Sequence, residues 1–215
     1  MACVELLGFA AGPYQTNCYV LIAGQRATVI DPGMNAQGPI EQYLSEHHIE
    51  LEQVVLTHGH IDHTRDAASL ANAWDVPVWI HRADAFMLEA GEGVSPESQV
   101  LFCAATMPQA KHLEFLKHGE TITMAGEKFA IRHAPGHSPG SLLFVGATVC
   151  FSGDVLFQGS IGRTDLPQSD PEAMEVSLRE QVATLSPNLQ VLPGHGPSTT
   201  VRAELASNPF LQSKR

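Results

Sequence analysis

The sequence has no apolar run of the length that a membrane span requires, which is about 18 residues. Its largely apolar beginning, Met1 to Ala11, has no basic segment and no long hydrophobic stretch, unlike a secretory signal peptide. We therefore expect a cytoplasmic protein that does not bind a membrane.

Cysteine is scarce as well. The four residues, Cys3, Cys18, Cys103 and Cys150, are scattered along the chain and form no C-x-x-C pair. In a chain of 215 residues this arrangement is typical of reduced, mostly buried thiols rather than of a disulfide framework. Neither Cys18 nor Cys150 has the flanking charge that activates a thiol, so we expect no cysteine nucleophile.

Basic residues are few: Lys and Arg number 12 against 23 Asp and Glu, which gives a net charge of −11. Nucleic-acid-binding proteins usually present a basic face, so we expect no nucleic-acid partner. The negative net charge does not exclude an anionic small-molecule substrate. Whether such a substrate binds depends on the local electrostatic field at the site, to which bound ions contribute.

The sequence does contain enough apolar material for one sizeable core, at 44% hydrophobic and 16% charged residues, and we expect a single domain over residues 1–215. Short apolar runs bounded by Gly and Pro alternate with segments of helical periodicity. This order fits an α/β protein with two stacked mixed sheets and helices on both outer faces, a four-layer αββα sandwich. The expected strands are residues 4–9, 18–22, 27–30, 53–56, 76–80, 121–124, 128–133, 141–145, 148–151 and 189–192. The expected helices are residues 39–47, 65–74, 81–90, 96–105, 170–185 and 201–206, and residues 105–119 show no clear pattern.

The motif T-H-G-H-I-D-H at residues 57–63 follows one apolar strand and carries four potential metal ligands: His58, His60, Asp62 and His63. Crowded histidines repel one another when protonated, whereas neutral imidazole and carboxylate are ordinary ligands of a divalent ion. His58 and His60 alternate along an extended segment and can point the same way. The adjacent Asp62 and His63 must point apart, so the motif indicates two metals, or one metal and an auxiliary group.

Three further strands end in a loop marked by Gly or Pro that carries one potential ligand. These loops are H-A-P-G-H with His137, S-G-D with Asp154 and P-G-H-G with His195. Glycine lets the backbone adopt positive φ and approach an ion closely. Each residue alone is weak evidence, but four such strand ends together predict one metal site.

The order H-x-H-x-D-H, isolated His, isolated Asp and last His resembles that of the metallo-β-lactamase-fold hydrolases. Within that superfamily, A-P-G-H-S-P-G at residues 134–140, F-S-G-D at 151–154 and P-G-H-G at 193–196 resemble the glyoxalase II, or hydroxyacylglutathione hydrolase, branch. G-S-I-G-R-T-D at 159–165 resembles a loop of its short bacterial members and of the related persulfide dioxygenases. The resemblance runs from Tyr14 to about Pro197 and is more specific for fold and metal site than for substrate.

This resemblance implies the metallo-β-lactamase fold and two divalent ions, zinc first, with iron or manganese as alternatives. The implied ligands are His58, His60 and His137 for the first ion, Asp62, His63 and His195 for the second, and Asp154 as the bridge. Asp62 would also orient the metal-bound hydroxide that attacks the substrate. Asp31 in D-P-G is either a plain turn residue or, as the resemblance suggests, a support for the metal loop.

The resemblance implies hydrolysis of a small-molecule glutathione thioester, such as a 2-hydroxyacyl-glutathione. Oxygen-dependent oxidation of a glutathione persulfide at one iron is a second class, and lactone or phosphodiester hydrolysis is a third. The ligand residues do not separate these classes, whereas a non-enzymatic metal-binding protein is disfavoured because no ligand position is missing.

Substrate recognition is less clear from the sequence. Arg163 could bind a substrate carboxylate, or it could pair with Asp165. The additional helical domain of full-length glyoxalase II has no counterpart after Pro197, so we expect a reduced glutathione site. We expect a monomer or a small homo-oligomer.

Overall fold

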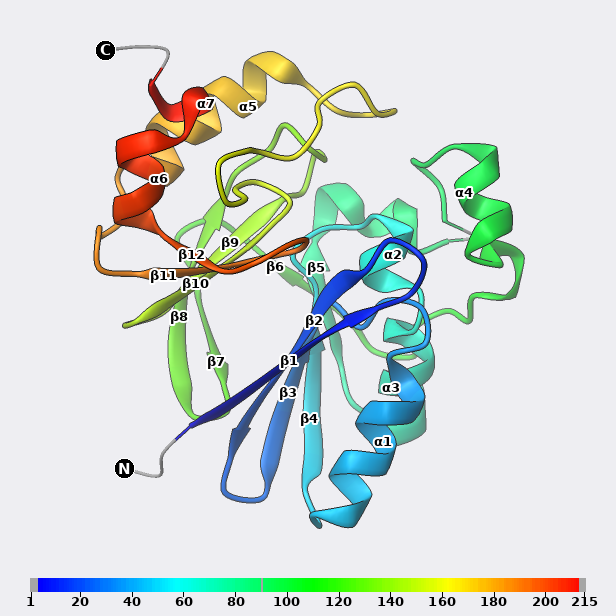
Figure 1. The fold of residues 1–215 in the computed structure, drawn as a ribbon. Coiled ribbons are helices and arrows are strands. Elements are labelled where there is room, and N and C mark those ends of the chain that lie inside the picture. Colours follow the sequence, from blue (N-terminus) through cyan, green and yellow to red (C-terminus); the bar gives the residue numbers. More distant parts are fainter. Residues whose placement is uncertain (1–3, 90, 213–215) are drawn as a thin grey trace.

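A computed structural model describes residues 4–89 and 91–212, so Cys3 and the end of the expected helix at Ala90 lie outside it. Within these ranges the strands form two six-stranded mixed sheets (Figure 1). The first sheet has the order β1 (Glu5–Ala11), β2 (Thr16–Ala23), β3 (Arg26–Ile30), β4 (Glu50–Val55), β5 (Val78–His81) and β6 (Leu113–Leu116). The second has the order β12 (Thr199–Thr200), β11 (Gln190–Pro193), β10 (Val149–Gly153), β9 (Leu142–Val145), β8 (Glu127–His133) and β7 (Thr121–Met124).

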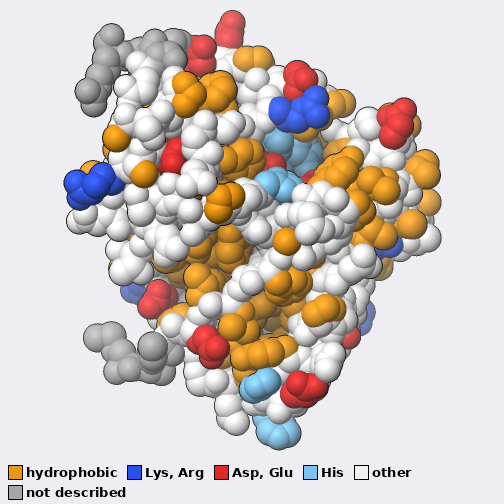
Figure 2. Space-filling view, viewed as in Figure 1, with side chains coloured by type: hydrophobic (Ala, Val, Ile, Leu, Met, Phe, Trp, Pro, Cys, Tyr) orange, Lys and Arg blue, Asp and Glu red, His pale blue; other side chains and the backbone are white. Residues whose placement is uncertain are grey.

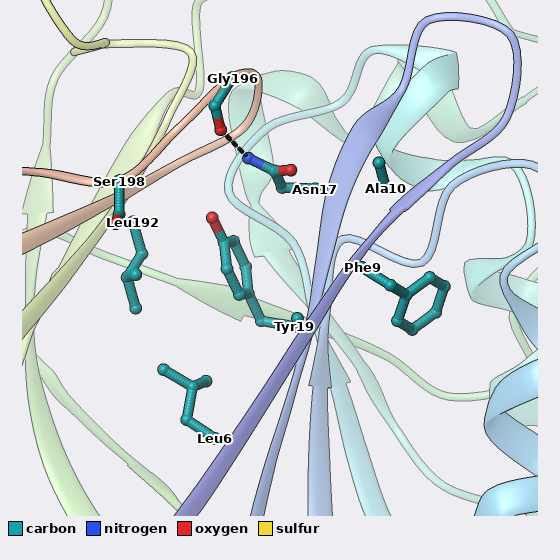
Figure 3. A pocket seen from close by; sticks show the side chains of 9 residues that line it. Leu6, Phe9, Ala10, Asn17, Tyr19, Leu192, Gly196 and Ser198 are labelled. Atoms are coloured by element: carbon teal, nitrogen blue, oxygen red, sulfur yellow. Dashed lines mark hydrogen bonds between the residues drawn. The ribbon is translucent and has the colours of Figure 1, made fainter.

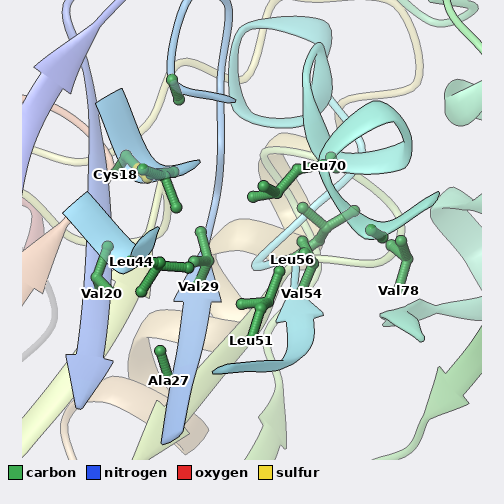
Figure 4. Close-up of a cluster of buried hydrophobic side chains, with 14 of the residues drawn as sticks. Cys18, Val20, Ala27, Val29, Leu44, Leu51, Val54, Leu56, Leu70 and Val78 are labelled. Carbon is green, nitrogen blue, oxygen red and sulfur yellow. The ribbon is translucent and has the colours of Figure 1, made fainter. Parts of the chain in front are cut away.

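Side-chain alternation along the strands explains why the sheets stack. In β2, Cys18 and Val20 pack on one face, and Tyr19 and Leu21 pack on the other. The first face meets helices, as Figure 4 shows for Cys18, Val20 and Leu44, and the second faces the other sheet. Strands with both faces buried therefore form the two inner layers.

Helices cover both outer faces, so the expected four-layer sandwich is confirmed. Helices α1 (Gln37–Glu46) and α3 (Ala67–Trp74) pack on the first sheet. Helix α5 (Pro171–Ser177), the π-helical turn η3 (Leu178–Val182) and α6 (Val201–Ser207) pack on the second. Figure 1 shows the two groups of helices on opposite sides of the sheets.

The parallel strands carry their loops to one edge of the sandwich. In the first sheet β3 pairs with β4 in parallel, and in the second β10 pairs with β11 in parallel. The carboxyl ends of β4, β10 and β11 lead into the loops that hold the predicted ligands, and β8 brings a fourth loop. Both sheets therefore contribute side chains to a common edge.

Several expected elements differ from the structure. The expected helix 65–74 is present as α3, which begins two residues later, and a one-turn helix that was not expected, α2 (Ile61–Thr64), precedes it. The expected helix 81–90 is wrong, because β5 continues through His81 and a 3₁₀ helix, η1 (Arg82–Leu88), follows. The expected helix 96–105 ends early, as α4 (Pro96–Leu101), and Cys103 at φ +51° separates it from the 3₁₀ turn η2 (Ala104–Thr106).

The remaining differences concern short elements. Strand β6 lies in the stretch that showed no pattern, and the two-residue strand β12 was not expected. The carboxyl-terminal segment forms two short helices, α6 and α7 (Pro209–Gln212), instead of one. No helix in the described part of the chain has both the length and the hydropathy of a membrane span.

Candidate metal centre

The first group of potential ligands consists of His58, His60 and His137, all buried, with donor atoms within 4.8 Å of one another. His58 and His60 come from the loop between β4 and α2, and His137 comes from the loop after β8. His60 Nδ1 lies 2.9 Å from His137 Nε2. Two imidazole ligands of one tetrahedral ion are about 3.3 Å apart, so this spacing suits a shared cation.

The second group consists of Asp62, His63 and His195, again with donor atoms within 4.8 Å. His63 Nε2 lies 3.3 Å from His195 Nε2 and 3.5 Å from Asp62 Oδ2. Asp62 and His63 both reach this group from the single turn of α2, so the expectation that they point apart is wrong.

Asp154 lies between the two groups. Its Oδ2 is 3.5 Å from His137 Nε2 in the first group, and its Oδ1 is 3.4 Å from His63 Nε2 in the second. It follows β10, where Gly153 has φ +48° and its α-carbon faces Thr57 so closely that any side chain would collide with it. Asp154 therefore has one carboxylate oxygen near each ligand group, as a bridging carboxylate requires.

Unsatisfied polar atoms show that these side chains fit a metal. His58 Nε2 and Asp154 Oδ1 are buried without a hydrogen-bond partner. An unpaired buried polar atom is costly, and coordination to a cation would remove that cost. The imidazole and carboxylate donors are those that divalent zinc, iron and manganese accept.

The electrostatics of the cluster favour the metal-binding forms of His58, His60, Asp62 and Asp154. At His63 and His195 burial opposes the charged form, but the neighbouring carboxylates outweigh it and raise the pKa of both rings. Burial and the neighbouring histidines hold the pKa of His58 well below its ordinary value and lower the pKa of His60 to about 3, so both rings are neutral. Burial opposes ionisation of Asp62 and Asp154, but His63 together with His195 and the other neighbouring histidines outweighs it and lowers the pKa of both carboxyl groups.

Asp31 contacts the ligand loop through its carboxylate. Its carboxylate accepts hydrogen bonds from the Thr57 amide at 2.8 Å and the Thr57 hydroxyl at 2.6 Å, and it lies 2.9 Å from His63 Nδ1. Asp31 has φ +50°, a conformation that few non-glycine residues adopt. These contacts go beyond those of a plain turn residue.

Asp84 is a buried residue of the site that the sequence reasoning missed. Its carboxylate accepts hydrogen bonds from the amides of Gly59 and Gly140 at 2.9 and 2.6 Å, and from the Ser138 hydroxyl at 2.6 Å. It therefore ties the loop of His58 and His60 to the loop of His137. The sequence signal was an acidic residue in an apolar stretch, which the assignment to an amphipathic helix concealed.

Two further contacts hold the isolated histidines. His137 Nδ1 lies 2.9 Å from the carbonyl oxygen of Arg163, so this loop orients the ring through its backbone. His195 Nδ1 lies 3.2 Å from the Tyr14 carbonyl oxygen, and the Asn17 side chain donates to the carbonyl of Gly196 (Figure 3). The groove beside Asn17 and Tyr19 in Figure 3, about 370 Å³, lies behind the His195 loop and contains none of the ligand residues.

Five of the seven candidate ligands, His60, Asp62, His137, Asp154 and His195, line a cleft of about 900 Å³. Figure 2 shows histidine side chains at the bottom of a hollow in the surface. Arg163 is the only Lys or Arg among the described residues that line the cleft, and its guanidinium binds both carboxylate oxygens of Asp165, at 2.7 and 2.9 Å. The pair with Asp165 is therefore the arrangement present. The apolar residues that line the cleft are Tyr14, Ile61, Val94, Phe157, Ile161, Leu166 and Pro167.

The described cysteines do not belong to the site. Cys18 and Cys150 are buried, and burial raises the pKa of Cys18 well above its ordinary value and that of Cys150 to about 12. Cys103 is a free, exposed thiol that does not line the cleft. A thiolate nucleophile is therefore excluded for these residues.

Comparison with known proteins agrees with the geometry. A sequence model of the Metallo-beta-lactamase superfamily matches residues 11–195, which include all seven candidate ligands. The chain is similar to the protein of Haemophilus influenzae called hydroxyacylglutathione hydrolase GloC, at 36% identity over 98% of this chain and 99% of that protein.

Two solved structures share both fold and sequence similarity. One is the crystal structure of BLEG-1 B3 metallo-beta-lactamase, at 33% identity and a TM-score of 0.86, with 97% of this chain and 100% of that chain covered. The other is TTHA1623 in a di-iron-bound form, at 35% identity and a TM-score of 0.81, with 95% and 100% covered.

Proposed function

The chain belongs to the metallo-β-lactamase superfamily, and from this premise we propose that it is a metal-dependent hydrolase of hydroxyacylglutathione thioesters. The observation that carries the proposal is the full-length similarity to GloC, combined with a ligand set in which no position is missing. The proposed ligands are His58, His60 and His137 for one ion, Asp62, His63 and His195 for the other, and Asp154 between them.

Zinc is the metal proposed first, because the site offers nitrogen and oxygen donors at spacings that suit a tetrahedral ion. The di-iron form of TTHA1623 supports iron as the alternative. A pair of divalent ions, when bound, supplies an acidified water and positive charge near the reacting carbonyl.

The protein's own groups would then position the reactants. Asp62 is held by the Thr16 hydroxyl at 2.9 Å and lies 3.1 Å from His195 Nε2, so its carboxylate has a fixed direction toward the cleft. We propose that Asp62 orients the attacking water and accepts its proton. Its lowered pKa makes it a weak base, so orientation is the larger part of this role.

The apolar wall of the cleft would hold the body of the thioester and exclude water from the reacting bond. Arg163 at the rim is proposed to contact a carboxylate of the glutathione portion. Asp165 already binds the guanidinium of Arg163, so a substrate carboxylate would have to share this guanidinium with Asp165 or displace Asp165 from it. We therefore expect Arg163 to contribute modestly to substrate affinity.

The test is thioester cleavage by purified protein loaded in turn with zinc, iron and manganese, with metal content measured for each sample. We expect turnover of S-lactoylglutathione that follows metal occupancy and disappears after chelation. The His112→Gln variant is the control, since His112 is exposed and pairs only with Asp75 on the surface. Fully loaded protein that leaves the thioester intact would contradict the proposal.

Hydrolysis of a β-lactam amide is the second candidate, favoured by the 33% identity to BLEG-1 B3 metallo-beta-lactamase over almost the whole chain. The same samples distinguish the two activities. Cleavage of a chromogenic cephalosporin with kcat/KM above that for S-lactoylglutathione would assign the β-lactam as the preferred substrate.

A further inference from the structure

The loop of residues 155–163 forms one wall of the cleft. Phe157, Ser160, Ile161 and Arg163 line the cleft, and Phe157 and Ser160 close the turn by pairing their backbones, with N···O distances of 3.0 and 3.4 Å. The carbonyl oxygen of Arg163 also lies beside His137 Nδ1. The position of this loop therefore affects both the shape of the cleft and the orientation of a candidate ligand.

Glu204 on helix α6 holds the tip of this loop, although it lies outside the cleft. Its carboxylate is only 2% exposed and accepts hydrogen bonds from the Gly159 amide at 2.8 Å, the Asn208 amide nitrogen at 2.8 Å and the Thr199 hydroxyl at 2.6 Å. None of these partners is a cation. A buried carboxylate without a cation is costly, and an apolar residue would serve helix packing better.

Asn208, at the end of α6, makes the second contact with the loop. It is fully buried, and its side-chain nitrogen donates to the Ser160 carbonyl oxygen at 3.0 Å as well as to Glu204. Backbone groups of two consecutive loop residues, the Gly159 amide and the Ser160 carbonyl, are thus bound by Glu204 of α6 and by Asn208, the residue that follows α6.

We propose that Glu204 and Asn208 are positioning residues that set the cleft wall for substrate binding, an inference that rests on the proposed function. Glu204 and Asn208 act on the substrate through this loop, because neither of them is among the described residues that line the cleft. Loss of the contacts lets the tip of the loop at Gly159 and Ser160 move, which weakens substrate binding, whereas the Arg163 carbonyl at the other end of the loop keeps its contact with His137.

The test compares Glu204→Ala, Glu204→Gln and Thr199→Val in the metal-loaded full chain. We expect Glu204→Ala to raise the amide exchange rate of Gly159 and Ser160, and to raise KM for S-lactoylglutathione, each about tenfold, with unchanged metal content. Glu204→Gln should keep both values near those of wild type. The glutamine oxygen can accept hydrogen bonds from Gly159 and Asn208, while the glutamine nitrogen faces the Thr199 hydroxyl. Thr199→Val removes a bond of the same carboxylate but leaves the loop contacts, so exchange and KM should stay near wild type.

Unchanged exchange and KM in Glu204→Ala would overturn the proposal, and so would an equal effect in Thr199→Val, since that would reflect general loosening of the helix. If Glu204→Ala does not fold, amide exchange and KM are measured for Asn208→Ala instead, and unchanged values in that variant would overturn the proposal. If wild-type protein with full metal cleaves no thioester, the proposed function fails, and the exchange rates alone then decide whether the loop is held by Glu204.

Discussion

The second ring nitrogen of most candidate ligand histidines is occupied by a protein group. His58 Nδ1 lies 3.1 Å from the Thr57 hydroxyl, His63 Nδ1 lies 2.9 Å from Asp31, and His137 Nδ1 lies 2.9 Å from a backbone carbonyl. Such contacts fix the tautomer and leave Nε2 for a metal. His60 differs, because its Nδ1 faces His137 Nε2 and is itself the donor atom that points into the cluster.

Replacing Asp154 tests the bridge between the two ligand groups. We expect Asp154→Ala to lose one or both ions and to reduce thioester hydrolysis by several orders of magnitude, because the histidines on either side would lose their shared carboxylate. Metal analysis and turnover measure the effect. Normal metal content with near-normal turnover would remove Asp154 from the ligand set.

Asp84 offers a test of loop support without touching a ligand. In Asp84→Asn an amide NH₂ must face one of three donors, so we expect unfolding free energy to fall by about 2–3 kcal/mol and metal to be retained less tightly. Urea unfolding and metal competition measure the two effects. Glu114→Gln, an exposed carboxylate on β6, is the matched control, and equal behaviour of the two variants would contradict this role.

Arg163 lines the cleft and also pairs with Asp165, so its two candidate roles can be separated by substitution. If its guanidinium binds a glutathione carboxylate, Arg163→Ala should lower kcat/KM about tenfold through KM, with unchanged metal content. A thioester without those carboxylates should be almost indifferent to the change. If both thioesters lose equally, Arg163 acts by holding the loop through Asp165.

At the scale of elements, two histidines link the ends of β5 and β8. The rings of His81 and His133 are stacked, with centroids 4.1 Å apart. His81 Nδ1 also accepts from the Ala83 amide at the start of η1, the segment that carries Asp84. The stack therefore joins the two sheets beside the ligand loops.

This stack predicts a pH dependence of stability. Burial, and then the neighbouring His133, lower the pKa of His81 to about 4 from 6.5, so the unfolded chain binds more protons between these values. Stability should be complete above about pH 6.5 and decline as pH falls toward 4. Because His81 is half-exposed, we expect its share to be about 1 kcal/mol between pH 7 and pH 5.

Urea unfolding at the two pH values checks this share. In His81→Asn the asparagine can still accept from Ala83 but does not titrate, so the loss of stability at pH 5 should be smaller than in wild type. An identical loss in both proteins would show that His81 does not contribute.

At the scale of the whole molecule, the candidate ligands link the two sheets. His58, His60, Asp62 and His63 follow a strand of the first sheet, whereas His137, Asp154 and His195 follow strands of the second. An ion bound by both sets would cross-link the sandwich at this edge. The core between the sheets supplies cohesion further from the edge, through residues such as Phe129, Phe144 and Phe151.

Removal of metal should therefore lower global stability. With free metal at about 100 times its dissociation constant, binding stabilises a folded protein by about 2.7 kcal/mol, and we expect at least this loss after chelation. Protons compete for the same imidazoles, so metal should also be released as pH falls. Unfolding curves with and without chelator measure the effect, and coincident curves would contradict cross-linking by the ions.

The sequence by itself determined the layers and the candidate ligands. The nearly continuous apolar runs in β2 and β3 are local and report burial on both faces, and histidines and aspartates placed directly after strands are recognisable from type and spacing. Strong periodicity also located the buried face of α5 and η3, with Met174, Leu178 and Val182. The π-helical turn was not visible, because the spacing of apolar residues does not specify hydrogen bonding.

Only the tertiary structure decided which polar residues support the site. Asp84, Arg163 through its carbonyl oxygen, and Glu204 each act on a segment at least 25 residues away. Three of their partners are the backbone amides of Gly59, Gly140 and Gly159, which carry no side-chain signature in the sequence. Short elements such as β6 and η1 were also decided by packing, since a few residues of weak propensity adopt the conformation that their neighbours impose.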